Sequence, residues 1–310
     1  MIVSDPERGA KSKAGRVGSG GATVLALEDL IRTHGPAGVS FEDGLSWLKS
    51  KMVLLLHSGG YASRNPNLTC KGKTFAPFVM AGDDIASPGG DFVKMMECPT
   101  VFDVKMSLLS PICKNLRAMM GPNNGGVFVA AGDVVDVFDT FDFPLGNRYQ
   151  GGVIAFGHLS PFDYAELHGT FVIDQDETNF DGLMNCASFR HKYKKDELLE
   201  LEKDGEKATF KDTESGVDNC IVDSDFYLPS EKVLLPLLRM LRNEKVNTAP
   251  TIENSTSSFV RGLMLNENGY GEFDVWGDLL SLCGSRSTLN RGIEDSISII
   301  VRVDHQVRRG

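Results

Sequence analysis

The amino-acid sequence predicts an α/β fold in which a mostly parallel sheet lies between helical layers. Short continuous apolar runs at 52–56 and 126–131 are typical of strands that are covered on both faces. Segments in which apolar residues have helical spacing, such as 101–120, lie between runs of this kind. This alternation along the chain is the pattern that places helices on both faces of a parallel sheet.

A glycine-rich segment at 18–23 precedes the first predicted helix, in which Val24, Leu27 and Ile31 have helical spacing. A glycine turn directly before a helix presents backbone N–H groups and the positive end of the helix dipole to an anion. Phosphate binding is one interpretation of this segment, and a flexible linker of the same composition is the other. Residues 35–46, which follow the helix, are predicted to be irregular.

The strand at 52–56 is followed at once by His57, Ser58 and the pair Gly59-Gly60. Two glycines let the backbone adopt positive φ and approach a ligand closely. Arg64 and Lys73 follow in the same loop, and two cations beside a glycine turn at the end of a strand suit a phosphate chain. The alternative is a surface loop that carries two solvated cations.

The next helix, 101–120, is expected to bend at Pro111. The strand at 126–131 that follows ends in Gly132-Asp133. The carboxyl ends of parallel strands are where an open α/β sheet keeps its ligand chemistry, so Asp133 is a candidate for holding a divalent metal ion.

Further strands are predicted at 152–156, 169–173, 220–222 and 296–303, and the strand at 220–222 is expected to end before Asp223. A helix is expected from 230 to 241, with Ser230 as its N-cap. Asp274 and Asp278 are about one helical turn apart, so they share a face if 273–280 is helical.

Composition excludes several classes of function. A net charge of −10 over 310 residues argues against a general surface for nucleic acid or anionic membrane. No apolar run approaches the roughly 20 residues of a membrane helix, and the first residues lack the basic and apolar parts of a signal peptide. The six cysteines have no metal-ligand spacing. We therefore expect a cytoplasmic protein with reduced thiols.

Two glycine turns, two cations and carboxylates after strand ends are suited to a polyphosphate together with a metal ion. Nucleotidyl or phosphoryl transfer needs little covalent help from a protein, because cations and Mg²⁺ offset the charge and hold the attacking oxygen in line. This chemistry fits a sequence in which no Ser/His/Asp or thiolate arrangement with convincing spacing is found.

Six segments resemble the GDP-L-fucose pyrophosphorylase (fucose-1-phosphate guanylyltransferase) and L-fucokinase family. They are RVGSGGAT, LLHSGGYASRNPN, VFVAAGD, HGTFVID, DSDFYL and FDVWGDLL, in the family's order. The resemblance extends from about residue 2 to 287 and implies a Rossmann-like (GT-A-like) nucleotidyltransferase domain over 1–290, without the family's C-terminal β-helix. Residues 291–310 are then expected to form a C-terminal strand and the start of a following region.

The resemblance implies that GTP and L-fucose 1-phosphate are joined to give GDP-L-fucose and pyrophosphate, with Mg²⁺ as cofactor. It also implies the role of each site residue in turn. Nucleotide binding falls to Gly18, Ser19, Gly20, Gly21, Thr23, Gly59 and Gly60; catalysis to Arg64 and Lys73; the sugar phosphate to Lys192, Asp223 and Ser224; and the metal to Asp133 with either Asp274 or Asp278.

The sequence departs from the family pattern at three places. Asn65 follows Arg64 where a leucine is usual, Gly132 replaces an acid found in many relatives, and Tyr193 replaces a proline after Lys192. The chain also lacks the glycine- and serine-rich loop of the sugar-kinase half. The alternative function is therefore a catalytically silent nucleotide-sugar-binding fragment that associates with a sugar-kinase domain. The choice of sugar and of guanine rests on the resemblance alone.

Overall fold

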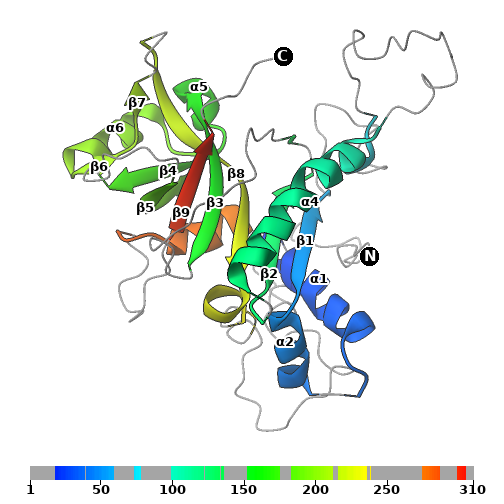
Figure 1. Ribbon diagram of the computed structural model, residues 1–310. Helices are drawn as coiled ribbons and strands as arrows, with labels where there is room; N and C mark the ends of the chain where they lie inside the picture. Colours follow the sequence, from blue (N-terminus) through cyan, green and yellow to red (C-terminus); the bar gives the residue numbers. More distant parts are fainter. Residues whose placement is uncertain are drawn as a thin grey trace, which may run out of the picture.

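The computed structural model describes residues 18–38, 40–58, 73–77, 99–121, 123–132, 134–135, 152–174, 183–211, 216–235, 238, 274–286 and 299–304. These parts form a sheet with helices on its faces (Figure 1).

The sheet has nine strands, and its main path has the order β1-β2-β8-β3-β9-β5-β4-β6. The strands are β1 (Met52–His57), β2 (Gly126–Ala131), β3 (Val153–Pro161), β4 (Gly169–Asp174), β5 (Leu183–His191), β6 (Glu206–Lys207), β7 (Phe210–Lys211), β8 (Asp218–Pro229) and β9 (Ile299–Asp304). Strand β7 pairs with β8, and β4 also pairs with β8. Because of this last pairing, the path β8-β3-β9-β5-β4 returns to β8 and closes on itself.

The α/β class is confirmed, but the expectation of a mostly parallel sheet is wrong. Among the described strands, parallel pairing joins β1 to β2 and β3 to β9, and the other pairs are antiparallel. The continuous apolar runs from which parallel strands were predicted indicate only that a strand is buried on both faces of the sheet. Antiparallel strands are buried in the same way when helices cover both faces of the sheet, so the pattern does not give strand direction.

Helices cover both faces of the β1-β2-β8-β3 part of the sheet, as predicted. On one face, α1 (Gly18–His34) and α2 (Phe41–Lys49) pack against a core that includes Val127 and Val129. On the other, α4 (Val101–Met120) packs against Phe128 and Ala130. Successive residues of β2 thus alternate between the two cores, which is the period of a strand. The remaining helices, α5 (Phe162–Ala165) and α6 (Lys195–Lys203), lie near β4 and β8 (Figure 1).

Helix α4 and strand β2 have the bounds that the sequence predicts. The segment expected to be irregular instead contains α2, whose N-cap Ser40 forms a capping box with Asp43. The helix expected from Ser230 begins as the π-helical turn η5 (Ser230–Leu234), and its N-cap is Pro229, so Ser230 is not the cap. The expected C-terminal strand is present as β9, inside the sheet between β3 and β5.

Strand β8 is the largest difference from the sequence-based expectation. It continues through Asp223, Ser224 and Asp225 to Pro229, instead of ending before them. Opposite these residues, strand β3 has a register shift between Ala155 and Gly157. The three polar residues therefore lie in the middle of a strand.

No helix in the described ranges is both long enough and apolar enough to span a bilayer.

Replacement of Ile112 by Ala should lower the free energy of unfolding by about 2–5 kcal/mol, because Ile112 is fully buried between α4 and the sheet. Met119, on the same helix, is 39% exposed, and Met119→Ala should change stability by no more than about 0.5 kcal/mol. Urea unfolding followed by circular dichroism measures both. Equal losses in the two variants would contradict the described packing of α4.

Candidate functional site

The glycine-rich segment 18–23 is the first part of α1, and the expectation of a turn before the helix is wrong. Gly18 begins the helix with a φ of 75°, a conformation that glycine adopts without strain. Gly20 and Gly21 are buried within the helix, which begins six residues before the expected start at Val24. Glycine has low helix propensity, so the sequence favoured a turn, but tertiary contacts of this segment outweigh that preference.

Those contacts begin with Ser19, which joins α1 to the π-helical turn η7 (Val275–Leu279). Its Oγ donates to Asp274 Oδ1 at 3.1 Å and accepts a hydrogen bond from the backbone N–H of Val275 at 2.8 Å. The same Asp274 oxygen accepts from the backbone N–H groups of Trp276 at 2.8 Å and Gly277 at 3.1 Å. Asp274 is therefore the N-cap of η7, and Ser19 completes the cap from the other end of the chain.

Thr23, one helical turn after Ser19, contacts the end of β1. Its Oγ1 donates to the Ser19 carbonyl at 2.9 Å and lies 3.0 Å from His57 Nε2. Because the single hydroxyl proton is used, Thr23 accepts from His57, which assigns the imidazole proton to Nε2. The His57 ring meets the Trp276 ring edge-on, with centroids 5.3 Å apart. Burial lowers the pKa of His57 to about 4, against a smaller opposing effect of Asp274, so His57 is neutral at physiological pH.

Two of the predicted sugar-phosphate residues meet at the turn before β4. Asp223 Oδ1 accepts from the backbone N–H of Gly169 at 2.6 Å, and the backbone N–H of Lys192 donates to the His168 carbonyl at 2.8 Å. Lys192 has a φ of 59°, a left-handed conformation that is uncommon for a residue other than glycine. Such conformations concentrate at functional sites, where surrounding contacts maintain them.

The third predicted residue, Ser224, lies beside η7. Its carbonyl accepts a hydrogen bond from Trp276 Nε1 at 3.4 Å. Its own Oγ is buried and has no hydrogen-bond partner among the described residues. A buried hydroxyl without a partner is costly unless a ligand or water supplies one, so Ser224 is suited to a polar ligand.

His191 brings the sugar-phosphate residues against η7 as well. A Cβ atom placed on Gly277 would lie 2.6 Å from His191 Nδ1, so the backbone of η7 lies directly on the imidazole. Burial lowers the pKa of His191, while Asp274 acts in the opposite direction. The turn η7 therefore contacts the α1 residues on one side and the β5 end on the other.

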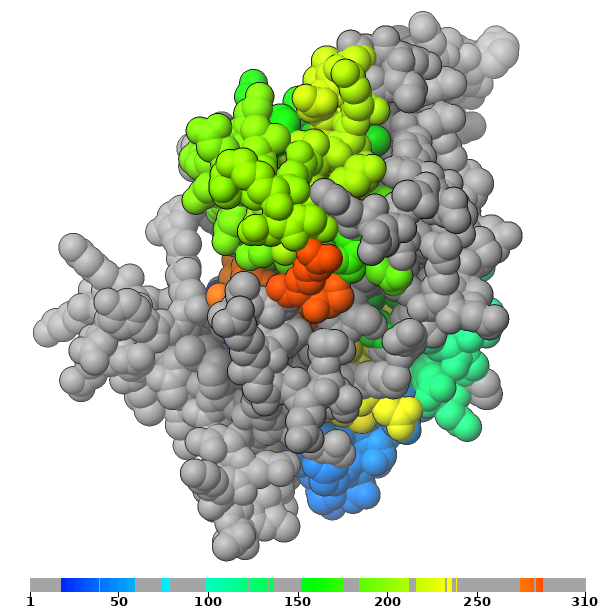
Figure 2. All heavy atoms as spheres, turned by 90° about the vertical axis from the view of Figure 1, so that its left-hand side faces the viewer, coloured from blue at the N-terminus to red at the C-terminus, as the bar shows by residue number. Residues whose placement is uncertain are grey.

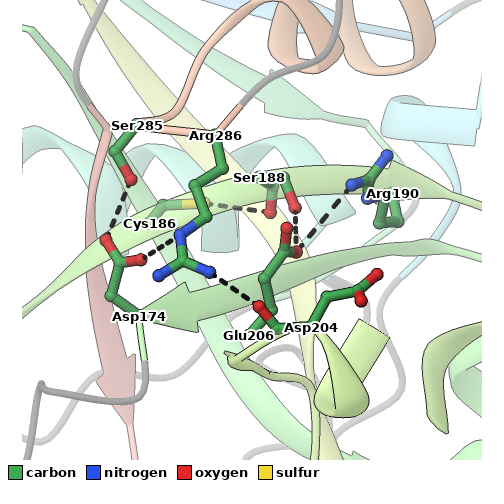
Figure 3. Close-up of polar contacts among 8 residues, drawn as sticks. All are labelled: Asp174, Cys186, Ser188, Arg190, Asp204, Glu206, Ser285 and Arg286. Atoms are coloured by element: carbon green, nitrogen blue, oxygen red, sulfur yellow. Dashed lines mark hydrogen bonds and ion pairs between the residues drawn. The ribbon is translucent and has the colours of Figure 1, made fainter. Parts of the chain in front are cut away.

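The segment that follows η7 is fixed to the sheet by a polar cluster (Figure 3). Asp174 at the end of β4 accepts from Ser285 Oγ at 2.9 Å and pairs with Arg286 Nε at 3.0 Å. Nearby, Glu206 accepts from Ser188 Oγ at 2.9 Å. Figure 2 shows the segment at the surface, in orange, beside the yellow-green part of the chain. The contacts of Ser285 and Arg286 with Asp174 hold the segment after η7 against the end of β4.

At the carboxyl ends of β1 and β2, Gly132 is enclosed. Its N–H donates to the His57 carbonyl at 2.9 Å, and its carbonyl accepts from Thr74 Oγ1 at 3.4 Å. A Cβ atom on Gly132 would lie 2.3 Å from Thr74 Oγ1. The position thus has no room for the acid expected from the family pattern unless the neighbouring backbone shifts.

The structure brings together part of the predicted site. The predicted site residues that lie within the described ranges are Gly18, Ser19, Gly20, Gly21, Thr23, Lys192, Asp223, Ser224, Asp274 and Asp278. Arg64, Gly59, Gly60 and Asp133 lie outside the described residues, and so does the side chain of Lys73, whose backbone begins η1 (Lys73–Phe75). Among the described residues, no three His, Cys, Asp or Glu side chains form a metal-binding group.

Sequence reasoning missed an ion pair between Lys105 of α4 and Asp225 of β8. Lys105 Nζ lies 3.6 Å from Asp225 Oδ2, and the side chains are 1% and 0% exposed. A signal was available, because Lys105 has helical spacing with the buried residues Leu109, Ile112 and Leu116. A lysine on the apolar face of a helix indicates a buried partner.

The family described as "Fucose pyrophosphorylase domain" matches residues 46–303. The chain belongs to this family. It is 24% identical over 293 residues to a human fucose-1-phosphate guanylyltransferase, an alignment that covers 88% of this chain and 38% of that protein. It is 28% identical over 180 residues to the protein of that name from Mus musculus, covering 57% and 25% of the two chains.

A bifunctional fucokinase/GDP-fucose pyrophosphorylase from Arabidopsis thaliana is 29% identical over 189 residues, which are 57% of this chain and 16% of that one. This chain therefore spans less than half the length of these curated relatives. Among solved structures it is similar to a UDP-glucose pyrophosphorylase complexed with UDP-glucose, with a TM-score of 0.35 and 12% identity over 82% of this chain and 90% of that one.

Acid should weaken the fold through His57. The unfolded chain binds a proton on this imidazole below about pH 6.5, and the folded protein binds it only below about pH 4. The contribution of neutral His57 to the free energy of unfolding is therefore fully present above the pKa of the unfolded chain. It is lost as the pH falls toward the pKa of the folded protein. Between pH 7 and pH 5 the wild type should lose about 2 kcal/mol more than His57→Gln in urea unfolding.

The matched control is His34→Gln, at the exposed end of the helix that carries Thr23. Its stability should follow the wild type over the same pH range. Parallel pH profiles for the wild type and His57→Gln would contradict the burial of a neutral His57.

Proposed function

We propose that this chain is a nucleotidyltransferase that joins GTP and L-fucose 1-phosphate to give GDP-L-fucose and pyrophosphate, with Mg²⁺. One observation carries the proposal: residues predicted for the nucleotide, such as Ser19 and Thr23, and for the sugar phosphate, such as Ser224, meet around the single turn η7. The names of the relatives from Homo sapiens and Mus musculus support the choice of substrates.

In the proposed reaction, a phosphate oxygen of the sugar 1-phosphate attacks the α-phosphorus of GTP. The new O–P bond forms as the bond between the α-phosphorus and the bridging oxygen breaks, and pyrophosphate leaves with the electron pair. Arg64 and Lys73 hold the triphosphate and offset the charge that moves onto pyrophosphate. Lys192 offsets the charge of the sugar phosphate, and Ser224 Oγ offers the sugar an otherwise unused hydrogen-bonding group.

The structure changes the role that we propose for the first glycine segment. The Ser19 hydroxyl is bonded to Asp274 and Val275, so it holds α1 against η7, and the Thr23 hydroxyl is bonded to the Ser19 carbonyl and to His57 at the end of β1. The phosphate contacts then fall to the backbone N–H groups at the start of α1, around Gly18, Gly20 and Gly21. The first N–H groups of a helix have no partner within it, and the helix dipole favours an anion there.

Carboxylate oxygens are ligands that Mg²⁺ prefers, and the candidates are Asp133, Asp274 and Asp278. Asp274 Oδ1 already accepts from one hydroxyl and two backbone N–H groups. Asp278 is exposed, and its Oδ2 accepts from the backbone N–H of Asp274 at 2.7 Å. We therefore propose Asp278 as the metal ligand that works with Asp133, and Asp274 as the cap. The bound metal would neutralise phosphate charge.

A second candidate is a nucleotide-sugar-binding part of a longer protein that does not turn over by itself. The observation that favours it is the coverage of the relatives, of which this chain spans 38% or less. The name of the Arabidopsis thaliana relative also supports association with a sugar-kinase domain. Thermal stabilisation by GDP-L-fucose without turnover would favour this candidate over the enzyme.

We also propose a cytoplasmic location. Cys113, Cys186, Cys220 and Cys283 are free thiols in the structure, which fits a reducing compartment.

Pyrophosphate release from GTP should require both a sugar 1-phosphate and Mg²⁺. Lys73→Ala and Asp133→Ala should each lower kcat/KM at least about tenfold, or roughly 1.4 kcal/mol of transition-state stabilisation, because each removes charge compensation from the reacting phosphates. A coupled pyrophosphate assay with four nucleoside triphosphates and a panel of sugar 1-phosphates measures this. Full activity in either variant would refute the role of that residue.

The substitutions Asp274→Asn and Asp278→Asn should distinguish the residue that caps η7 from the residue that binds the metal ion. Asp274→Asn weakens an N-cap that binds three donors, so it should lower stability by about 1 kcal/mol. Asp278→Asn removes charge from an exposed side chain, so it should raise the Mg²⁺ concentration for half-maximal rate several-fold, with little loss of stability. Melting curves and Mg²⁺ titrations of both variants measure this, and the opposite pattern would assign the metal to Asp274.

A further inference from the structure

The ion pair of Lys105 and Asp225 is buried, and the proposed chemistry does not use it. Its two side chains are 1% and 0% exposed and come from α4 and β8. Removal of two charges from water is costly, and their attraction repays it only when the remaining hydrogen-bonding groups are also satisfied. Such a pair contributes little net stability, and in some proteins its use is to specify one geometry.

The other carboxylate oxygen of Asp225 binds the backbone at the end of β2. Asp225 Oδ1 accepts from the backbone N–H of Ala131 at 3.1 Å. The ladder between β2 and β8 ends at the pair Val129 and Phe226, so this N–H lies beyond the last strand-to-strand pair. The carboxylate takes the place of a ladder acceptor and fixes the end of β2. Charged acceptors form stronger hydrogen bonds than neutral ones.

The next residue of the chain connects this point to two other elements. Gly132 donates to the His57 carbonyl at the end of β1 and accepts from Thr74 Oγ1 in η1. Thr74 is 1% exposed. In the sequence, Thr74 directly follows Lys73, and Gly132 directly precedes Asp133. The short backbone segment 131–132 is therefore a junction between the two chain segments that carry the proposed cation and the proposed metal ligand.

We propose that Lys105 and Asp225 are positioning residues for the reaction: the pair fixes the Ala131–Gly132 junction and, through it, the contact of Gly132 with Thr74, the residues that directly adjoin Asp133 and Lys73 in the sequence. Asp225 makes the contact with the backbone, and Lys105 supplies the opposite charge that allows a carboxylate to be buried there. The effect on catalysis rests on the proposed function, whereas the fixed junction does not. A displacement of about 1 Å in a catalytic group is enough to lower a rate up to about a hundredfold.

Two double variants isolate the positioning contact. Lys105→Met with Asp225→Asn removes both charges and keeps an oxygen that can accept from Ala131. Lys105→Met with Asp225→Leu also removes both charges but leaves no acceptor, in a side chain of similar size. Lys105→Met alone leaves a buried charge without compensation, so it should melt at a lower temperature, and the added Asp225→Asn should restore melting.

Three measurements read these variants: melting temperature, amide hydrogen exchange of the peptide that contains Ala131 and Gly132, and pyrophosphate release with a Mg²⁺ titration. The Asn double variant should resemble the wild type in all three. The Leu double variant should still melt cooperatively, but its Ala131 amide should exchange at least about tenfold faster, since its acceptor is lost. Its kcat should fall at least about tenfold with KM for GTP little changed, and it should need more Mg²⁺.

If the Leu double variant exchanges and turns over like the Asn double variant, the pair is merely structural and the proposal is wrong. If the wild type releases no pyrophosphate from any substrate pair, the proposed function fails, and amide exchange still decides whether Asp225 fixes the junction.

If the Leu double variant does not fold, Thr74→Val and Thr74→Ser test the same junction without touching a buried charge. Val should lower kcat and raise the Mg²⁺ requirement, and Ser should retain both. Wild-type kinetics in Thr74→Val would then overturn the proposal.

Discussion

Strand β8 changes neighbours in its middle, and the rest of the site depends on this. Along one edge it pairs with β4 at Ile221 and Val222 and with β2 from Phe226 onward, so residues 223–225 lie between the ends of two strands. The side chains of Asp223 and Asp225 fill that interruption. Asp223 accepts from the backbone N–H at the start of β4, and Asp225 from the one at the end of β2. Two backbone donors that would lack a strand partner are thereby satisfied.

An interruption of this kind is also a suitable place for a ligand. Here the residue between the two carboxylates, Ser224, has a buried hydroxyl without a described partner, and its carbonyl binds Trp276 of η7. The turn η7 then joins this point to Ser19 at the start of α1. One local feature of the sheet thus determines where distant segments of the chain meet.

The sequence predicted correctly those helices and strands whose local residue pattern matches the way they pack in the fold. Helix α4 and strand β2 were placed correctly, because each has one clear period and a clear end. Strand β8 was cut short, because acidic residues inside a strand are rare unless backbone donors outside the ladder satisfy them. The helical segment that begins at Gly18 was missed for a related reason: its stability comes from hydroxyl contacts with residues about 255 positions away. Neither contact leaves a local signal.

The same contacts affect the electrostatics of the proposed phosphate site. Three of the carboxylates in the region, those of Asp223, Asp225 and Asp274, accept hydrogen bonds from backbone N–H groups. The positive end of each N–H dipole points at the carboxylate and offsets part of its negative potential. In a chain with a net charge of −10, the proposed site is thus built partly from acidic residues whose charge backbone donors offset, and the proposed cations would determine its affinity for anions.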